Sequence, residues 1–427
     1  MKIHFYPKDF SSKFKLAASV AAARDIKPIL QNVKVKADKK VGAILQATDT
    51  ELGIRIRVDC DVTTEGEAIL PTKKLTQILD LTGEERLTIE STESDEKDVY
   101  ALNAQLPDDD DDDDDEYDDE DEDNDDDDDD DDMPVRRRSS AMAPRGKPQR
   151  TVIGGENENY DLNTQSPDEF PNVEEFEETA YHEIPAKALK EMIRRTIFAI
   201  DTENIRYALG GVYFEMVDGN ISVVATDGRR LAWQEGKGEC VKGHKVEASI
   251  LPARTLQILE RVLNDKSIDD DDDIRMAISA NRVLFQCKDV TLFSRLVEGR
   301  FPKWRGIIPK TDDDTPVMIE CGALLPAILR AQIATSDLEP GVFFTFDEGK
   351  LVLRGEGKEI GNSTSDVPIS FDGQKKTLKL DPKYMTSFLR VLDSGTVLSI
   401  FLPPDNDPVK ITADEGRYVY VVMPMST

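Results

Sequence analysis

An aspartate on a tight turn with arginines behind it is the first group in this sequence that could do chemistry. The stretch ATDGRRLAW at 225–233 sets Asp227 before a glycine, and ATDTELGIR at 47–55 repeats the pattern around Asp49. Two carboxylates that share one substrate can act as general acid and general base. A motif that returns with its flanking segments argues instead for a repeated structural unit, in which the two aspartates lie in different domains, too far apart to share a substrate. We therefore expect each aspartate to hold its turn, in a protein that is not an enzyme and has no catalytic residue.

Side chains that bind metals are present but scattered. The chain has four cysteines without a CxxC pair and three histidines in unrelated segments. Zinc, haem and disulfide frameworks need closer spacing, so we expect no metal and no cofactor. No apolar run approaches the length of a membrane span, and the N-terminal MKIHFYPKDF lacks the apolar core of a signal peptide. The sequence predicts a reduced, cytoplasmic protein that contacts no membrane.

The elements that would position these turns repeat three times along the chain. An Ile-Leu-Pro leads into a helical pattern at 68–79 and at 249–259, and KLDPKYMTSFLRVL at 379–392 is a third copy. Proline suits the first turn of a helix, where its missing N–H has no partner. A further helical pattern precedes each copy, at 9–23, 186–199 and 322–335. Because strand patterns outnumber helices, we expect an α+β fold of three repeated units, each with two helices and antiparallel sheet.

One segment stands apart from the repeats by its composition. Residues 108–132 hold 23 acidic side chains in 25 positions, so of the formal charge of −32 the rest of the chain carries only −9. The following RRRSSAMAPRGKPQR at 136–150 is basic and has almost no large apolar group. Neither half can bury enough surface to fold, which predicts a disordered insertion over 108–165. The other predicted divisions are a first domain at 1–107, a return to its end and a linker at 166–178, a second domain at 179–313 and a third at 314–427.

Basic residues gather on the predicted helices of this acidic chain. Across the six helical windows we count thirteen Lys or Arg against five Asp or Glu, whereas the whole chain has 54 against 86. This distribution indicates one positive surface that faces a polyanion, although any single helix could simply have a solvated face. No phosphate-binding lysine loop, zinc finger or RNA-binding aromatic motif accompanies the charge. We expect contacts to phosphates without base reading, and hence salt-sensitive binding without sequence specificity.

Taken together, these segments resemble the bacterial sliding clamp family, the β subunits of DNA polymerase III. The resemblance rests on ordered motifs, which are KPIL at 27–30, ATDTELGIR, DEFPNV at 168–173, NIRYALGGVYFE at 204–215, VVATDGRRLA at 223–232, LVEGRFPKWRGIIPK at 296–310 and YVVMPM at 420–425. It implies three domains per chain and a head-to-tail homodimer that closes as a ring around double-stranded DNA. It also implies a processivity factor of DNA replication, at the nucleoid or replisome, that tethers DNA polymerase and clamp-loader subunits through short peptide motifs.

The resemblance implies site residues as well. The peptide-binding groove between the second and third domains comprises Leu209, Thr226, Gly228, Arg229, Arg230, Leu231, Arg300, Pro302, Ile307, Tyr384, Val421, Met423, Pro424 and Met425. Contacts to DNA fall to Arg24, Arg206, Tyr207 and Arg254. The dimer interface falls to Lys74, Tyr100 and Leu102 on one side and to Ile333 and Ala334 on the other. For Arg24 a solvent-exposed loop position, and for Tyr207 a partly buried strand position, stay open as alternatives.

The chain departs from the family at several places and leaves other functions open. It ends MPMST where the family has Met-Pro-Met-Arg-Leu, and Arg229, Trp233 and Glu339 stand where other side chains are usual, so peptide preference is expected to differ. The main alternative is an acidic chaperone that holds histone-like or other basic proteins with the poly-Asp tract. That function would not explain the basic helices or the repeats. The insertion is either a tethered electrostatic regulator that competes with DNA or a solubilising segment without a specific contact.

Overall fold

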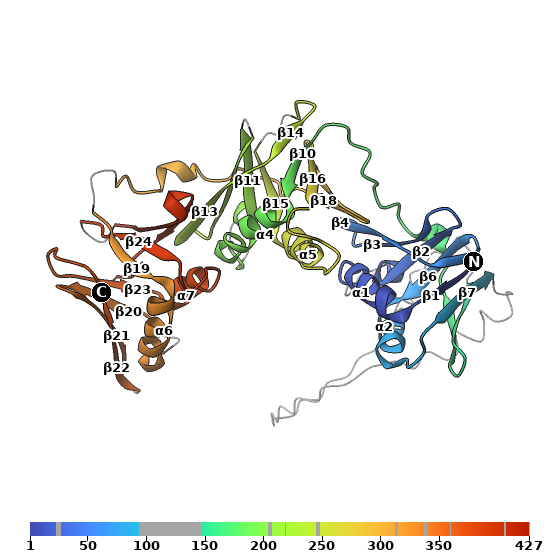
Figure 1. Ribbon diagram of the computed structural model, residues 1–427, viewed down its shortest axis with the longest axis horizontal. Coiled ribbons are helices and arrows are strands. Elements are labelled where there is room, and N and C mark those ends of the chain that lie inside the picture. The colour runs from blue at the N-terminus through green and yellow to red at the C-terminus, as the bar shows by residue number, and fades with distance from the viewer. Residues whose placement is uncertain are drawn as a thin grey trace, which may run out of the picture.

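The computed structural model describes residues 1–22, 27–93, 147, 149–203, 207–217, 219–244, 248–311, 315–336, 340–358, 360–404 and 407–426. These residues form an arc of three similar parts, the first, second and third domains (Figure 1). Their strands lie within 2–164, 181–295 and 317–422, respectively. Across these described ranges no helix is long and apolar enough to cross a membrane.

In its described residues the first domain has two helices and two sets of strands. The helices are α1 (Pro7–Ala18) and α2 (Thr72–Leu81). One set has the order β5 (Asp61–Thr64), β1 (Lys2–Phe5), β7 (Leu87–Glu93), β8 (Gln149–Gly154) and β9 (Asn159–Thr164). The other has the order β4 (Leu52–Val58), β3 (Gly42–Thr48), β2 (Asn32–Asp38) and β6 (Gly66–Pro71). Phe10 and Phe14 of α1 are fully buried against this core.

The second domain repeats this plan in the part that the structure describes. Its helices are α4 (Ala186–Arg194) and α5 (Ala253–Leu263). One set of strands has the order β14 (Glu239–Val241), β10 (Tyr181–Pro185), β16 (Asp273–Ile278), β17 (Arg282–Cys287) and β18 (Val290–Arg295). The other has the order β13 (Arg230–Lys237), β12 (Asn220–Thr226), β11 (Gly211–Val217) and β15 (Ser249–Pro252).

The third domain follows the same order among its described residues. Its helices are α6 (Cys321–Ala331), continued by the short turn η6 (Gln332–Ala334), and α7 (Pro382–Leu389). The strands of one set are β19 (Val317–Glu320), β24 (Val397–Phe401), β25 (Val409–Ala413) and β26 (Tyr418–Val422). Those of the other are β22 (Gly361–Pro368), β21 (Lys350–Gly357), β20 (Val342–Asp347) and β23 (Lys376–Leu380). The predicted fold, α+β with two helices and antiparallel sheet in each of three units, is confirmed.

Among the described strands, two sheets run without a break from one domain into the next. Strand β18 of the second domain pairs with β4 of the first, with Leu292 opposite Ile54, in a nine-stranded sheet. Strand β13 of the second domain pairs with β26 of the third, with Leu231 opposite Val421, in an eight-stranded sheet. Both pairings are antiparallel. Because each junction is made by backbone hydrogen bonds, the ladder itself sets how neighbouring domains are oriented.

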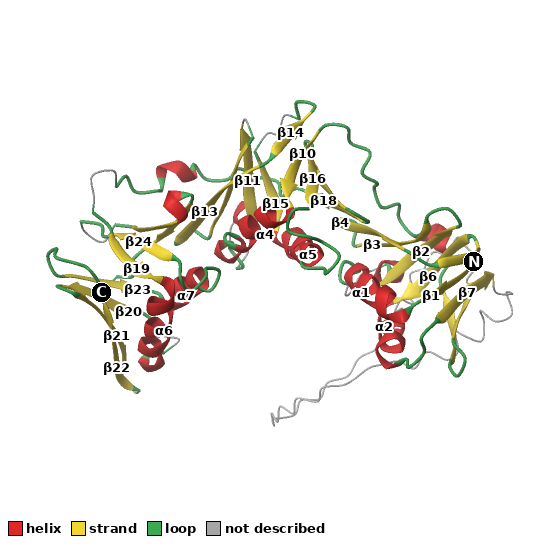
Figure 2. Cartoon of the chain, viewed as in Figure 1, coloured by secondary structure: helices red, strands yellow, loops and turns green. Residues whose placement is uncertain are grey.

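The helices line the inner side of the arc and the strands form its outer side (Figure 2). The helices pack in pairs, α1 with α2, α4 with α5 and α6 with α7. The described helices α1, α2, α4, α5, α6 and α7 together contain twelve Lys or Arg and only four Asp or Glu. The excess of positive charge that the sequence predicts is therefore carried by the inner elements.

The repeated proline marks the start of a helix in each domain. Pro71 and Pro252 stand directly before α2 and α5 with extended backbone, at φ of −65° and −60°. Pro382 is instead the first residue of α7. There Asp381 caps the helix, because its carboxylate accepts from the N–H of Lys383 at 2.8 Å. Proline fixes φ near the helical value in all three cases, which ends the strand and opens the helix.

The prediction of a disordered insertion over 108–165 is wrong for the C-terminal part of that range. Strands β8 and β9 occupy 149–154 and 159–164, inside the predicted disordered range. Strand β8 pairs directly with β7, with Glu93 opposite Gln149, and it buries Ile153 completely. The acidic segment therefore interrupts the connection from β7 to β8 within the first sheet, instead of following a completed first domain. Residues 94–146 and 148, which include the whole poly-Asp tract, lie outside the described residues.

This connectivity predicts that the interrupting segment is dispensable for folding while β8 and β9 are not. Replacing 96–145 by a short glycine-rich turn should keep the stability of the first domain, because Glu93 and Gln149 are already paired neighbours. Deleting 108–165 should lower its free energy of unfolding by more than about 3 kcal/mol, because the core loses Ile153 and two strands. Hydrogen exchange of first-domain amides measures both. Equal protection in the two deletions would mean that 149–164 contribute nothing to the sheet.

Candidate functional site

The two aspartate turns have the same hydrogen bonds. One carboxylate oxygen of Asp227 accepts from the backbone N–H groups two and three residues later, at 2.9 and 3.0 Å. The corresponding oxygen of Asp49 accepts from the equivalent N–H groups at 3.0 and 2.7 Å. The threonine before each aspartate closes the turn, because the Thr226 hydroxyl donates to the carbonyl of Arg230 at 2.6 Å and Thr48 makes the equivalent bond at 2.8 Å. Both aspartates are thus turn acceptors, as the repeat predicts.

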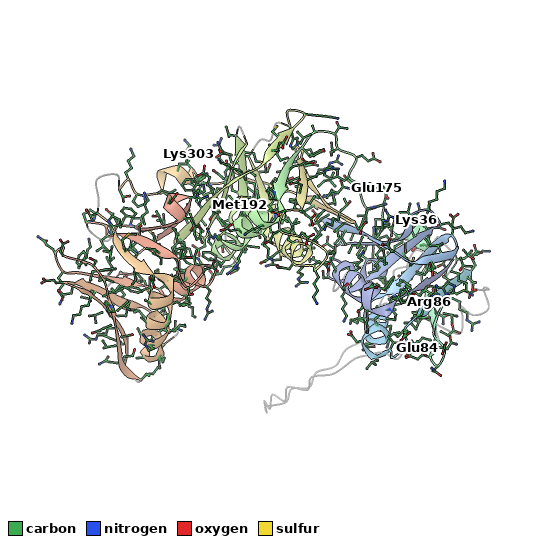
Figure 3. The ribbon with its side chains drawn as sticks, in the orientation of Figure 1. Lys36, Glu84, Arg86, Glu175, Met192 and Lys303 are labelled. Atoms are coloured by element: carbon green, nitrogen blue, oxygen red, sulfur yellow. The ribbon has the colours of Figure 1, made fainter. Side chains whose placement is uncertain are left out.

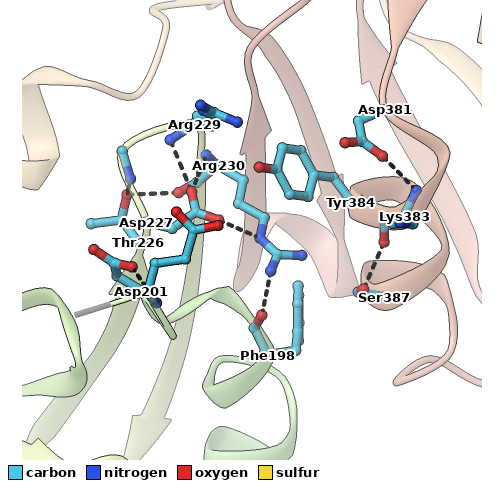
Figure 4. A network of polar contacts seen from close by, with 12 residues as sticks. Phe198, Asp201, Thr226, Asp227, Arg229, Arg230, Asp381, Lys383, Tyr384 and Ser387 are labelled. Atoms are coloured by element: carbon cyan, nitrogen blue, oxygen red, sulfur yellow. Dashed lines mark hydrogen bonds and ion pairs between the residues drawn. The ribbon is translucent and has the colours of Figure 1, made fainter. Parts of the chain in front are cut away.

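Each turn lies at a domain junction. In the first domain Asp49 accepts from Nη1 of Arg254, which lies at the start of α5 in the second domain, at 2.5 Å. In the second domain Asp227 accepts from Nε of Arg230 at 2.9 Å (Figure 4). The Arg230 guanidinium also lies over the ring of Tyr384 in the third domain, 4.5 Å from its centroid. The repeated motif therefore connects the second domain to both of its neighbours.

A second cluster of charges joins the second and third domains. The side chain of Arg195 is buried and forms an ion pair with Glu191 at 2.7 Å and another with Asp414. The Tyr418 hydroxyl donates to the backbone carbonyl of Arg195 at 2.7 Å, and its ring lies 5.1 Å from the guanidinium. Burial raises the pKa of the Tyr418 hydroxyl, so the tyrosine stays neutral beside the ion pairs.

An apolar cluster lies on the face of the shared eight-stranded sheet beside the Asp227 turn. We call it the junction cluster, and its buried members are Leu209, Val224, Leu231, Ile250, Phe301, Trp304, Val419 and Val421. Trp233 packs against it from β13. The connecting segment that leads from the second domain to the third, through η5 (Trp304–Gly306), covers this face. The cluster is formed where strands of two domains and their connection meet.

The structure brings most of the predicted groove residues to this junction, in two classes. Leu209, Thr226, Leu231 and Val421 are between 1 % and 4 % exposed, so they form a closed floor. Ile307 and Met423 are 43 % and 42 % exposed and offer apolar surface to a ligand. The remaining groove residues are partly or fully exposed, namely Gly228, Arg229, Arg230, Arg300, Pro302, Tyr384, Pro424 and Met425. The C-terminal segment is held in place because the N–H of Met423 donates to the carbonyl of Arg229 at 2.9 Å.

An open cavity of about 430 Å³ adjoins the Asp227 turn. Its lining carries both signs of charge, from Asp201, Glu203, Arg229 and Arg230, together with the ring of Tyr384. A hydrogen bond with Tyr384 raises the pKa of Arg229. The junction thus combines an apolar wall with a polar, permanently charged recess, which is the make-up of a site for an extended peptide.

The predicted DNA contacts fall largely outside the described residues. Arg24 and Arg206 are not described, and of Tyr207 only the backbone is, in the short turn η4 (Tyr207–Leu209). Arg254 is half exposed, but its guanidinium is bound to Asp49 and to the carbonyl of Val20 at 3.2 Å. Its described contacts are those of a residue that fastens the first junction, and its contact with DNA stays a prediction.

The predicted interface residues are distributed unevenly. Lys74 is exposed on α2 and Ile333 is 71 % exposed on η6, whereas Tyr100 and Leu102 lie outside the described residues. The side chain of Ala334 is buried in its own domain and offers almost no surface to a partner. No pattern in the sequence singled out Ile360, which is 59 % exposed close to η6 beside β22.

Two histidines that are far apart in the sequence meet at the edge of the second domain. Nδ1 of His182 lies 3.0 Å from Nδ1 of His244, whose Nε2 lies 3.0 Å from the carbonyl oxygen of Ile278. Burial and the neighbouring His244 lower the pKa of His182, which favours the neutral form of His182. Within the described ranges, no group of three or more His, Cys, Asp or Glu gathers as metal ligands do.

Comparisons with known proteins agree with this architecture. Residues 1–108, 183–303 and 305–426 match the models described as the N-terminal, central and C-terminal domains of the DNA polymerase III beta subunit. The chain is 28 % identical to the beta sliding clamp of Halalkalibacterium halodurans, over 65 % of this chain and 73 % of that protein. It is 27 % identical to the beta sliding clamp of Escherichia coli strain K12, over 65 % and 74 %. The solved DNA polymerase sliding clamp of Bacillus subtilis superposes with a TM-score of 0.80 at 21 % identity, covering 100 % of this chain and 99 % of that one.

The two aspartate turns predict opposite changes in the free energy of unfolding when the residue after each aspartate is exchanged. Thr50 has φ of 79° and Gly228 has φ of 89°, a region that a β-branched residue adopts only with strain. Thr50→Gly should raise the free energy of unfolding by about 1 kcal/mol, and Gly228→Thr should lower it by at least about 1 kcal/mol. Denaturant unfolding midpoints measure both changes. A lower midpoint for Thr50→Gly would show that the first turn is not strained.

Proposed function

The chain belongs to the family of DNA polymerase III beta subunits, the bacterial sliding clamps, and we propose that two copies of it close head to tail around double-stranded DNA. It is a DNA sliding clamp, which encircles the duplex and keeps the replicative polymerase on its template. A closed ring stays on DNA because it encloses the duplex and not because it binds particular bases, so its binding does not depend on base sequence. Its action is to hold partners, and no chemical step is assigned to any residue. A basic-protein chaperone has no support among the relatives.

The repeated domain junctions carry the proposal of a ring. Strands β18 and β26 are matching outer strands of the second and third domains, and each pairs with a matching strand of the preceding domain, β4 or β13. The strand of the first domain that matches β18 and β26 is β9, and the strand of the third domain that matches β4 and β13 is β22. Both lie at the edge of their sheets, and among the described strands neither has a partner on its outer side. We infer that β9 of one chain pairs with β22 of the other, because each edge supplies the N–H and C=O groups that the other needs.

This pairing changes the residues that we assign to the interface. On β9, Tyr160 and Leu162 take the place given to Tyr100 and Leu102, because β9 is the edge strand of the first domain. Beside β22, the exposed Ile333 and Ile360 present apolar surface. Burying such apolar side chains next to an unpaired strand edge would stabilise the association with a second chain.

The inner helices suit a duplex in size and charge. Two copies of the described chain would bring twelve helices around the ring. At about 9 Å between neighbours the helix axes lie on a circle about 35 Å across. Because each helix is about 10 Å thick, the opening is about 25 Å wide, which holds a duplex about 20 Å wide with a thin layer of water. Lys187, Lys190 and Arg194 on α4 are among the basic residues of this inner layer. We assign to such residues water-screened contacts with phosphates.

The junction between the second and third domains is the proposed site for partner peptides. Ile307 and Met423 offer the accessible apolar surface, and Arg229 and Tyr384 border the charged recess. Methionine adapts its shape to different side chains, which suits a groove shared by several partners. We propose that segments of DNA polymerase and of clamp-loader subunits bind here, in the cytoplasm at replicating DNA.

The ring predicts that one charge at the edge of the third domain separates the two chains. Ile333→Asp should give the mass of a single chain in native mass spectrometry, because a carboxylate would be buried without a partner in the interface. Wild-type protein assembled on nicked circular DNA should stay bound until the DNA is linearised. The variant should be lost from both forms of DNA.

Val217→Asp is the matched control for this experiment. Val217 is also exposed, but it ends β11 in the second domain, away from β9 and β22. This variant should keep the mass of two chains and the retention on circular DNA. A wild type with the mass of one chain, or retention that does not depend on DNA topology, would contradict the ring.

The groove predicts a loss of peptide affinity without loss of the fold. Ile307→Ala combined with Met423→Ala should weaken the binding of a polymerase-derived peptide at least about tenfold, because exposed apolar anchors carry much of such binding. Isothermal calorimetry measures the affinity. Met318→Ala, at an exposed methionine on β19, is the control and should bind as the wild type does. Unchanged affinity of the double variant would remove both residues from the site.

A further inference from the structure

The two tryptophans of the chain meet in the junction cluster. Trp233 lies on β13 and Trp304 lies in η5, and their ring centroids are 5.3 Å apart. The two rings come from different walls of the proposed groove, one from the shared sheet and one from the connecting segment. Trp304 is buried, and the guanidinium of Arg305 lies 4.2 Å from the centroid of its ring. The pair therefore lies between the connecting segment and the sheet.

The tryptophan pair closes the apolar floor of the groove. Leu231 is two residues before Trp233 on the same face of β13, and Val421 lies opposite Leu231 on β26. Both floor residues are almost fully buried in the cluster that contains the two rings. Because both floor residues are almost fully buried, a peptide side chain reaches them only if a side chain of the cluster moves. Trp233 is held by paired strands on both sides, so Trp304, in a turn of three residues, is the ring that is freer to move.

Trp233 has a hydrogen-bond donor without an acceptor. Its Nε1 is buried and unpaired, and among the described side chains only Nη1 of Arg230, three residues earlier on the same strand, shares that condition. A buried donor without a partner destabilises the fold by about 1–3 kcal/mol. A phenylalanine would remove that donor and its penalty, with some loss of ring area. The closed arrangement thus holds a donor that a backbone carbonyl could satisfy.

The equivalent position at the first junction shows what such a donor binds. Counting along the repeated turn, Arg55 of ATDTELGIR matches Trp233 of ATDGRRLAW. Arg55 donates to the backbone carbonyl of Val173 at 3.1 Å and forms an ion pair with Glu175, both in the segment that connects the first domain to the second (Figure 3). There the chain supplies the carbonyl itself. At the second junction no described group of the chain accepts from the indole N–H, so a bound molecule can supply the acceptor.

We propose that Trp233 and Trp304 are the specificity residues of the groove. The rings part to admit one apolar side chain of a bound peptide, which then rests on Leu231 and Val421, while Nε1 of Trp233 donates to a backbone carbonyl of that peptide. The inference rests on the proposed peptide groove and names what it selects, an extended segment with a large apolar side chain beside a free carbonyl.

Trp233→Phe tests the hydrogen bond, because it keeps an aromatic ring and removes the N–H. The melting temperature of the free protein should rise, since the unpaired donor is gone, and the affinity for a polymerase-derived peptide should fall about tenfold. A ring that served packing alone would not change the two measurements in opposite directions. Trp304→Phe is the matched control, because it loses the same ring area but removes no buried unpaired donor. It should lower the melting temperature and weaken binding less.

Tryptophan emission provides a second, independent readout, because both tryptophans of the chain lie at the site. Titration of the wild type with a polymerase-derived peptide that contains phenylalanine should change the emission and saturate at the Kd from calorimetry. The same peptide with alanine in that position should bind more weakly and change it less. Unchanged emission at saturation, or equal affinity of Trp233→Phe, would overturn the inference alone. A wild type that binds neither peptide would contradict the proposed groove itself.

Discussion

The β-ladder across the domain junctions is the interaction on which the rest of this structure depends. Hydrogen bonds from β18 to β4 and from β13 to β26 make neighbouring domains parts of one sheet. The curvature of the arc then follows from the twist of shared sheets and not from flexible connections. Because matching strands pair at each junction, the described strands leave a matching edge unpaired at either end of the chain, β9 in the first domain and β22 in the third. The geometry that joins domains thus also favours joining a second chain.

Side-chain contacts at the two aspartate turns, where the sequence at first suggests catalysis, stabilise the domain junctions. The carboxylates of Asp49 and Asp227 are occupied by turn N–H groups and by arginines, which leaves them no free role as acid or base. Arg195 and Asp414 make a further ion pair between the second and third domains. Partly buried charges of this kind are costly to separate, since removing one partner leaves the other unpaired. They therefore resist bending at the junctions.

The two junctions differ in a way that bears on where the proposed groove lies. Gly53 stands at the first junction where Leu231 stands at the second, and an added Cβ at Gly53 would lie 2.9 Å from a methyl carbon of Val173. The connecting segment consequently packs directly onto the backbone there. At the second junction, Leu231 and the two tryptophans keep the connecting segment away from the strand. The space between them is filled by the side chains of the junction cluster.

The sequence by itself determined the features that depend on near neighbours. The helix at 253–263 and the paired aspartate turns were predictable because spacing, proline and turn acceptors act within a few residues. Most of the groove residues could be assigned through the resemblance, but not which of them are buried. Strands β8 and β9 were missed because edge strands carry few apolar residues, and only pairing with the distant β7 makes 149–164 a sheet. The closed floor at Leu231, the contact of Trp233 with Trp304 and the unpaired indole N–H were decided by the tertiary structure alone, because they arise where segments far apart in the chain meet.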